Sequence, residues 1–265
     1  MKNVFLSILR RLPRLKAALK KLRDALLSAS SVSSHYIEMS GASVNVESVR
    51  LRSAWQDDAL PKKQRALVDR QLIDYRGGAA IDVFDVMVEA LRNLPKGEGR
   101  TSVLEVGCSS GFYSEVFDIA GLDVTYSGAD YSDAFIALAR QKYPTLRFDI
   151  EDATALRYPA NAFDVVISGC CLLHIPEYEA AVAETARVAR RYAVFHRTPV
   201  VLDQPNLYFR KLAYGVETVE IHFNEIQFLE LLSTHGLELL KTWTLSENPA
   251  VAPSQAVRTY LCRVV

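Results

Sequence analysis

Short apolar runs of strand length alternate with segments of helical periodicity through the middle of this chain. The runs lie at residues 103–106, 122–129, 145–150, 163–169 and 192–198. Helical patterns at 112–120 and 178–190 are among the segments that separate them. Strands that alternate with helices predict an α/β fold with a parallel sheet, whose strands all open at their carboxyl ends on one edge. Ligands bind at that edge, so the polar residues that follow each run are the candidates for chemistry.

The pattern divides the chain into three parts. Residues 1–50 predict a basic amphipathic helix followed by a polar linker or loop over 28–50. Residues 51–99 predict a helical segment, and residues 100–265 the main domain. The helical segment carries two patterns, at 61–75 and 81–91.

The last third of the chain predicts a helix at 224–236 and a closing pair of strands at 237–245 and 256–264. Before them, residues 199–222 form a long connection that is rich in aromatic residues. Connections longer than about 12 residues are usually functional or disordered. We therefore assign 199–222 to the substrate side as an insertion.

The turn after the first run is the most informative motif. Glu105 lies near the end of that run, and Gly107 and Gly111 follow within Gly-Cys-Ser-Ser-Gly. Glycines allow unusual dihedral angles and a close approach of ligand to backbone, and the carboxylate suits a ligand with positive charge, such as S-adenosylmethionine. Three alternatives stay open: a dinucleotide site, which would need a third glycine; a hydrolase nucleophile elbow with Ser109 as nucleophile; and a turn without a ligand.

Carboxylates also follow the second and third runs. Asp130 ends the second run, 25 residues after Glu105, which is about one strand–helix–strand unit. A carboxylate at that position can accept hydrogen bonds from both hydroxyls of a ribose. Asp152 follows the third run and can accept a hydrogen bond from the exocyclic amine of adenine.

These signatures, in this order over residues 100–176, resemble class I S-adenosylmethionine-dependent methyltransferases of the small-molecule type. The resemblance implies a Rossmann-like, doubly wound sheet of seven strands, mostly parallel with an antiparallel last strand, preceded by N-terminal helices. It also implies a binding role for the residues that follow the strands. They are Glu105, Gly107 and Gly111 for the methionyl group, Asp130 for the ribose, Asp152 and Ala153 for adenine, with Ser109, Tyr131 and Cys170 completing the cofactor site.

One residue departs from the family pattern. The family often has glycine where this chain has Ser109, whose hydroxyl can donate to the methionyl carboxylate. In this family the upstream helices often cover the cofactor. That places Trp55, Gln71 and Tyr75 either in a lid or in ordinary packing.

Two histidines are the candidate catalytic residues. His174 follows the fourth run and His196 lies near the end of the fifth, so both are expected at the ligand edge. Either can accept a proton from an acceptor hydroxyl, or can instead hydrogen-bond to the backbone. Arg197 and Arg210 can hold a carboxylate or phosphate of the acceptor, or be solvated. The spacing of histidines and carboxylates supports no metal site.

The composition limits the classes of binding partner that the sequence favours. Lys plus Arg equals Asp plus Glu at 31 each, so no overall basic character points to nucleic acid. The four cysteines lack zinc-type spacing and suggest a reducing, cytoplasmic compartment. Residues 1–26 combine an apolar seam with many basic residues, which predicts docking on the chain itself, self-association or peripheral contact with a membrane; an organelle presequence is a further alternative.

Together these features predict an S-adenosylmethionine-dependent methyltransferase with a small-molecule acceptor. O-methylation, with a sugar or glycan intermediate as acceptor, is the preferred form. The alternatives are a catalytically inactive S-adenosylmethionine-binding protein and an α/β-hydrolase that uses Ser109.

Overall fold

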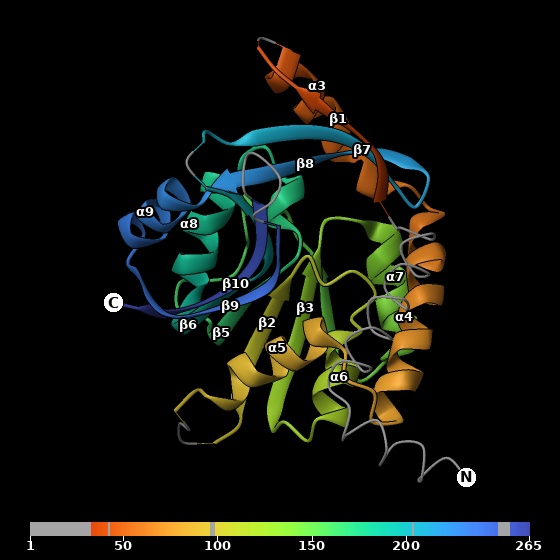
Figure 1. Cartoon of the computed structure of the whole chain (residues 1–265). Coiled ribbons are helices and arrows are strands. Elements are labelled where there is room, and N and C mark those ends of the chain that lie inside the picture. The colour runs from red at the N-terminus through yellow and green to blue at the C-terminus, as the bar shows by residue number, and fades with distance from the viewer. Residues whose placement is uncertain (1–32, 42, 96–98, 203, 249–254) are drawn as a thin grey trace, which may run out of the picture.

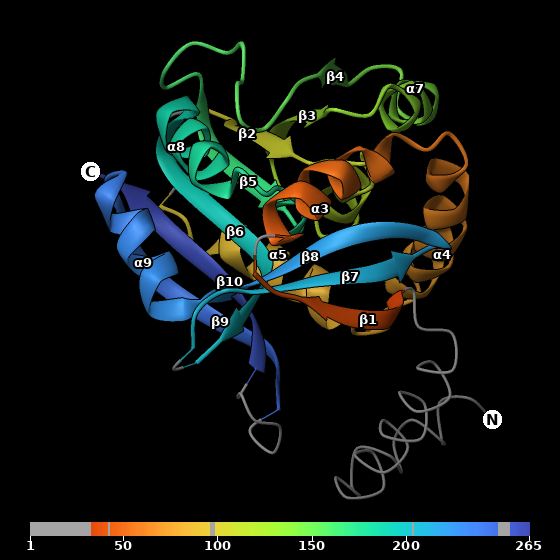
Figure 2. The same cartoon turned by 90° about the horizontal axis from the view of Figure 1, so that it is seen from above.

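A computed structural model describes residues 33–41, 43–95, 99–202, 204–248 and 255–265. Its centre is a twisted sheet flanked by helices on both faces (Figures 1 and 2). Five parallel strands form the middle of this sheet in the order β4-β3-β2-β5-β6. Their bounds are β2 Thr101–Val106, β3 Val124–Asp130, β4 Arg147–Ile150, β5 Phe163–Gly169 and β6 Ala189–Val201.

The antiparallel pair that the sequence predicted closes this sheet. Strand β10 (Gln255–Val264) pairs with β6 and with β9 (Leu237–Asn248), antiparallel in both cases. The seven strands together form the predicted mixed sheet. The fold class is therefore confirmed.

Helices cover both faces because both faces of the central strands are apolar. One core joins Val103, Val165 and Ile167 to the helices α4 (Leu60–Arg76), α5 (Asp82–Arg92), α6 (Tyr113–Ile119) and α7 (Asp133–Lys142). On the other side, helices α8 (Tyr178–Val188) and α9 (Glu225–Thr234) bury Val182 and Phe228. Strands buried on two faces read as continuous apolar runs, which is why the sequence marks them clearly.

Three further strands extend the sheet beyond the predicted seven. Strands β1 (Ser33–Met39), β7 (Leu207–Ala213) and β8 (Val216–Asn224) form an antiparallel layer in the order β1-β7-β8. Strand β8 joins the main sheet through a short parallel pairing with the end of β6. Figure 1 shows this layer, which we call the cover, lying across the carboxyl ends of β2 and β3.

The cover corrects two predictions. Residues 28–50 are not a linker where the structure describes them, since they contain β1 and most of helix α3 (Ser43–Arg52). Residues 199–222 are not an irregular connection, because they contain the end of β6, all of β7 and most of β8. Strands β7 and β8 meet at a two-residue turn, Tyr214-Gly215, where both residues have positive φ, as tight hairpins require.

The predicted amphipathic helix of residues 1–26 lies outside the described residues. None of the helices that the structure describes is long and apolar enough to cross a lipid bilayer.

Candidate functional site

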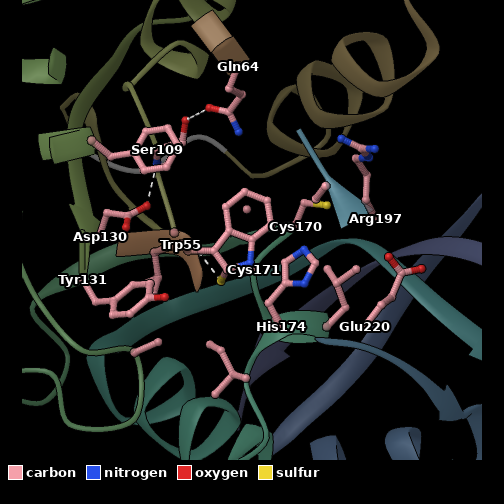
Figure 3. Close-up of a pocket in the computed structure, with 18 of the residues that line it drawn as sticks. Trp55, Gln64, Ser109, Asp130, Tyr131, Cys170, Cys171, His174, Arg197 and Glu220 are labelled. Atoms are coloured by element: carbon pink, nitrogen blue, oxygen red, sulfur yellow. Dashed lines mark hydrogen bonds between the residues drawn. The ribbon is translucent and has the colours of Figure 1, made fainter. Parts of the chain in front are cut away.

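A cavity of about 370 Å³ lies between the carboxyl ends of the parallel strands and the cover. This volume is within the range of sites for small molecules and cofactors. Residues after β2, β3 and β4 line one half, including Ser109, Asp130 and Asp152. The ends of β5 and β6 and the cover line the other half, including His174 (in the short helix η2, Leu172–His174), Arg197 and Glu220. Figure 3 shows Ser109, Asp130 and Tyr131 on one side, and Arg197 and Glu220 on the other.

The turn after β2 requires glycine at two positions. Gly107 and Gly111 have φ of +73° and +72°. A Cβ atom on Gly107 would lie 2.3 Å from the Cβ of Cys171, and one on Gly111 would lie 2.5 Å from the ring of Phe148. Both positions therefore need glycine for dihedral freedom and for space. Gly107 lines the cavity, whereas Gly111 does not and instead packs against Phe148 of β4.

Ser109 adopts a conformation that favours glycine. Its φ is +52°, which explains structurally why a glycine would suit this position. Its hydroxyl donates to Gln64 Oε1 and accepts from the N–H of Ser110. The hydroxyl thus links the turn to α4 through Gln64, which also lines the cavity.

Asp130 is a buried carboxylate at the tip of β3. It accepts hydrogen bonds from the N–H groups of Ser109 at 2.9 Å and Ser132 at 3.0 Å. Ser132 in turn caps the start of α7. Burial raises the pKa of Asp130 to about 6, although these N–H groups oppose the rise. At neutral pH it is a fixed, ionised acceptor on the cavity wall, next to Tyr131, which also lines the cavity.

Asp152 lines the same half of the cavity, beside Ala153. Its carboxylate accepts hydrogen bonds from Thr154 and from Arg52 Nη2, the latter at 2.6 and 2.7 Å. Burial raises the pKa of Asp152, but these hydrogen bonds and the charge of Arg52 outweigh it, so that the pKa is lowered overall. Arg52 ends α3, and its carbonyl accepts from the Tyr131 hydroxyl, so this segment is fastened to both strand tips.

Glu105 does not line the cavity, contrary to the expectation that it contacts the ligand directly. It is buried behind the wall and accepts a hydrogen bond from Tyr126. Its Oε1 lies 2.5 Å from the position that a Cβ atom on Gly169 would take. Burial raises the pKa of Glu105 to about 8, with the nearby charge of Asp130 adding to the rise. Two of the three expected acidic tips therefore share the cavity, and the third lies beneath it.

His174 lies in the cavity as predicted. Its Nδ1 is 2.5 Å from the carbonyl oxygen of Val219, and its ring packs on Trp55 with centroids 4.7 Å apart. Burial, with the charge of Lys211, lowers the pKa of His174 to about 4. The imidazole is therefore neutral at physiological pH, and donation from Nδ1 leaves Nε2 as a proton acceptor.

His196 does not reach the cavity, so its predicted catalytic position is wrong. Its Nε2 bonds to the Tyr113 hydroxyl at 2.8 Å and its Nδ1 to Thr259 Oγ1 at 2.9 Å, both in the core. Burial lowers the pKa of His196 well below its usual value. Both ring nitrogens are occupied, which makes the ring a structural connector between α6, β6 and β10.

A β-bulge explains why Arg197 rather than His196 faces the cavity. Phe195 pairs with Tyr260 and Thr198 with Arg258, so His196 and Arg197 together oppose the single residue Thr259. Arg197 has φ of +57°, a conformation that costs a non-glycine residue on the order of 1–3 kcal/mol. Bulges of this kind redirect side chains near functional sites.

The cover contributes a pair of charged residues whose contact the sequence did not predict. The Nζ of Lys211 on β7 and the carboxylate of Glu220 on β8 form a buried ion pair, and Glu220 Oε1 also lies 2.8 Å from His222 Nε2. Burial raises the pKa of Glu220, but His222 and Lys211 outweigh it and lower the pKa to about 2. The alternation of apolar and polar residues in 216–224 is the signal that would have revealed this strand.

Of the three residues for which both a lid and ordinary packing were open, only Trp55 lines the cavity. Tyr75 packs on Phe84 with centroids 5.3 Å apart. Gln64, about two helical turns before Gln71 along α4, lines the cavity in place of Gln71. The Trp55 indole N–H is buried without a partner, which leaves a donor available there.

Comparison with known proteins agrees with this geometry. A family model described as a methyltransferase domain matches residues 104–195, from β2 to the middle of β6. Over this segment, which includes β2, β3, β4 and β5, the chain is therefore similar to methyltransferases. None of the five histidines is hydrogen-bonded to Ser109, so the hydrolase alternative lacks its serine–histidine pair.

Several methyltransferases are similar over part of this chain. A demethylmenaquinone methyltransferase of Bacillus licheniformis is 33% identical over 104 residues, which are 38% of this chain and 44% of that protein. A probable S-adenosylmethionine-dependent methyltransferase of Mycolicibacterium smegmatis is 28% identical over 157 residues, 58% of each chain. The matches thus span about half the length of these relatives.

Among solved structures, the 1,6-didemethyltoxoflavin-N1-methyltransferase of Burkholderia thailandensis has the same fold. The alignment covers 86% of this chain and 93% of that one, with a TM-score of 0.57 and 15% sequence identity. That structure holds 1,6-didemethyltoxoflavin and S-adenosylhomocysteine. At 15% sequence identity this similarity shows a shared fold alone.

Proposed function

We propose that this protein transfers a methyl group from S-adenosylmethionine to a small organic acceptor. The observation that carries the proposal is the two-sided cavity, with ionisable acceptors at the tips of β3 and β4 on one side and a neutral histidine on the other. The match of residues 104–195 to a methyltransferase domain supports the same cofactor.

The residues of the first half fit the cofactor in chemistry. Asp130 offers an ionised carboxylate to the ribose hydroxyls, and Asp152 and Ala153 border the place for adenine. Ser109 and Gln64 supply polar groups near the backbone turn for the methionyl end. Glu105 lies behind the cavity wall, where its carboxylate packs against Gly169, which lines the cavity.

Bound S-adenosylmethionine would supply the methyl group and a sulfonium leaving group. The protein has to hold the acceptor in line with the methyl group and to keep water away, and such positioning is worth on the order of 7–11 kcal/mol. The cover and Trp55 close the acceptor half. His174 Nε2 accepts the proton of an acceptor hydroxyl, which favours O-methylation over transfer to a group that needs no base.

The test measures binding and turnover separately on the full chain. Calorimetric titration with S-adenosylhomocysteine is expected to show one site, and an assay for S-adenosylhomocysteine release across a panel of sugars, phenols, hydroxy acids and amines to show turnover with hydroxyl acceptors. His174→Gln should lower kcat at least tenfold with little change in KM, whereas His235→Gln, a matched change at the end of α9, should not. Absence of binding would refute the proposal, and binding without turnover on any acceptor would favour an inactive binding protein.

A further inference from the structure

Arg197 presents a positive charge at the cavity without a hydrogen bond or ion pair to its guanidinium among the described residues. Its side chain is exposed and lines the acceptor half of the cavity. No hydrogen bond or ion pair joins its guanidinium to any residue in the described ranges, whereas Arg52, which also lines the cavity, is held by two carboxylates. A guanidinium without a protein partner, inside a cavity, is a site for a negatively charged group.

The backbone is built to place this charge there. The β-bulge opposite Thr259 and the positive φ of Arg197 interrupt the alternation of β6 and turn consecutive side chains to different environments. His196 is buried in the core, while Arg197 reaches the cavity. A strained, non-glycine conformation held by the surrounding sheet indicates a function for the residue that adopts it.

The neighbouring carboxylate does not neutralise Arg197. Both oxygens of Glu220 are already engaged, one by Lys211 and the other by His222. Lys211 and Glu220 cancel in charge, and burial keeps the nearby hydroxyl of Tyr113 neutral by raising its pKa. His174 is neutral as well, so the acceptor half carries a net charge of about +1 from Arg197.

We infer that the methyl acceptor carries an oxyanion, a carboxylate or a phosphate, that the Arg197 guanidinium binds. This inference rests on the proposed function and names the class of its acceptor. The planar fork of arginine matches two oxygens of such a group, so Arg197 fixes the orientation of the acceptor. The aromatic side chains of Trp55, Tyr36 and Tyr214 line the same half and suit an apolar or ring-shaped body next to the charge.

The experiment uses small probes on the full chain saturated with S-adenosylhomocysteine. Benzoate and phenyl phosphate represent the two oxyanions, and benzamide is the neutral control of the same shape. We expect benzoate or phenyl phosphate to bind at least tenfold more tightly than benzamide, and Arg197→Met to remove that difference. Whichever oxyanion binds more tightly identifies the class. Arg210→Met is the matched control, because Arg210 lies on β7, pairs with Glu217 and does not line the cavity.

The outcomes separate this inference from the proposed function. Failure of the wild-type chain to bind S-adenosylhomocysteine refutes the proposed function itself. Normal cofactor binding combined with equal affinity for benzoate and benzamide overturns the oxyanion site alone. Loss of S-adenosylhomocysteine affinity in Arg197→Met also overturns it, because Arg197 would then hold the cofactor.

A second measurement needs no folded variant. Phenylglyoxal modifies exposed arginines, and peptide mapping by mass spectrometry can follow Arg197 in the wild-type chain. Benzoate or phenyl phosphate should protect Arg197 and leave Arg210 reactive, while benzamide should protect neither. Equal modification of Arg197 with and without the oxyanions contradicts the inference.

Discussion

Replacement of Asp130 by asparagine probes the cofactor half of the cavity most sharply. The carboxylate accepts two backbone N–H groups, from Ser109 and Ser132, so alanine would leave two buried donors unpartnered at about 1–3 kcal/mol each. Asparagine keeps the shape and one carbonyl acceptor, which limits the loss of unfolding free energy to about 1–3 kcal/mol. A hydrogen bond to a charged group contributes about 1.5–3 kcal/mol. Loss of the charge that faces the ribose hydroxyls should therefore raise the Kd for S-adenosylhomocysteine by roughly 30- to 140-fold, or about 2–3 kcal/mol.

The assay is calorimetric titration at pH 8, where Asp130 is ionised. Asp133→Asn is the matched control, because Asp133 is an exposed carboxylate in the first turn of α7, three residues away. Thermal unfolding first establishes that both variants are folded at the titration temperature. A folded Asp130→Asn chain that binds within threefold of the wild type would refute the assignment of this carboxylate to the ribose.

Three further predictions follow from the same geometry. Because burial raises the pKa of Asp130 to about 6, the affinity for S-adenosylhomocysteine should fall as the pH drops through 6, and Asp130→Asn should abolish this dependence. The same raised pKa makes the contribution of Asp130 to folding stability decline as the pH rises from about 4 to 6. Gly107→Ala should cost about 2–5 kcal/mol in urea unfolding, from overpacking and strain, whereas Gly121→Ala, also at positive φ but with open space, should cost only about 1–2 kcal/mol. Lys211→Met should cost about 3–5 kcal/mol by leaving Glu220 buried without its lysine, and adding Glu220→Gln should recover much of that loss; if the double variant is no more stable than the single one, the charge argument fails.

The central sheet was predictable because its signals are local. The strands β2 and β5 are continuous apolar runs, and the turn at Gly107 and Gly111 needs glycine for reasons of backbone geometry that a single sequence displays. Asp130 is the last residue of β3 and Asp152 comes two residues after β4, so the parallel topology alone brings them to one edge. These residues required no knowledge of distant contacts.

The cover was not predictable in the same way. Strand β1 pairs with β7, about 170 residues later in the chain, and neither strand is buried on both faces. A short, half-exposed strand with a distant partner resembles a loop in sequence. The residues that it brings to the cavity, Lys211 and Glu220, therefore look like ordinary surface charges until the pairing is known.

The wrong prediction that His196 faces the cavity, where the structure has Arg197, has a different cause. A regular strand would alternate its side chains from one face to the other, and the bulge opposite Thr259 shifts that alternation by one residue. The prediction for Glu105 failed in a similar way. Its position near the end of an apolar run suggested a contact with the ligand, but its side chain lies against Gly169 at the end of β5. Side-chain direction at strand ends depends on neighbouring strands, which a single sequence does not specify.

The most direct test of the account is a crystal structure of the full chain with S-adenosylhomocysteine. We predict the ribose hydroxyls at hydrogen-bond distance from Asp130, adenine beside Asp152 and Ala153, and the sulfur directed toward the half of the cavity that holds His174 and Arg197. A nucleoside bound away from Asp130, or a sulfur directed away from that half, would contradict the account.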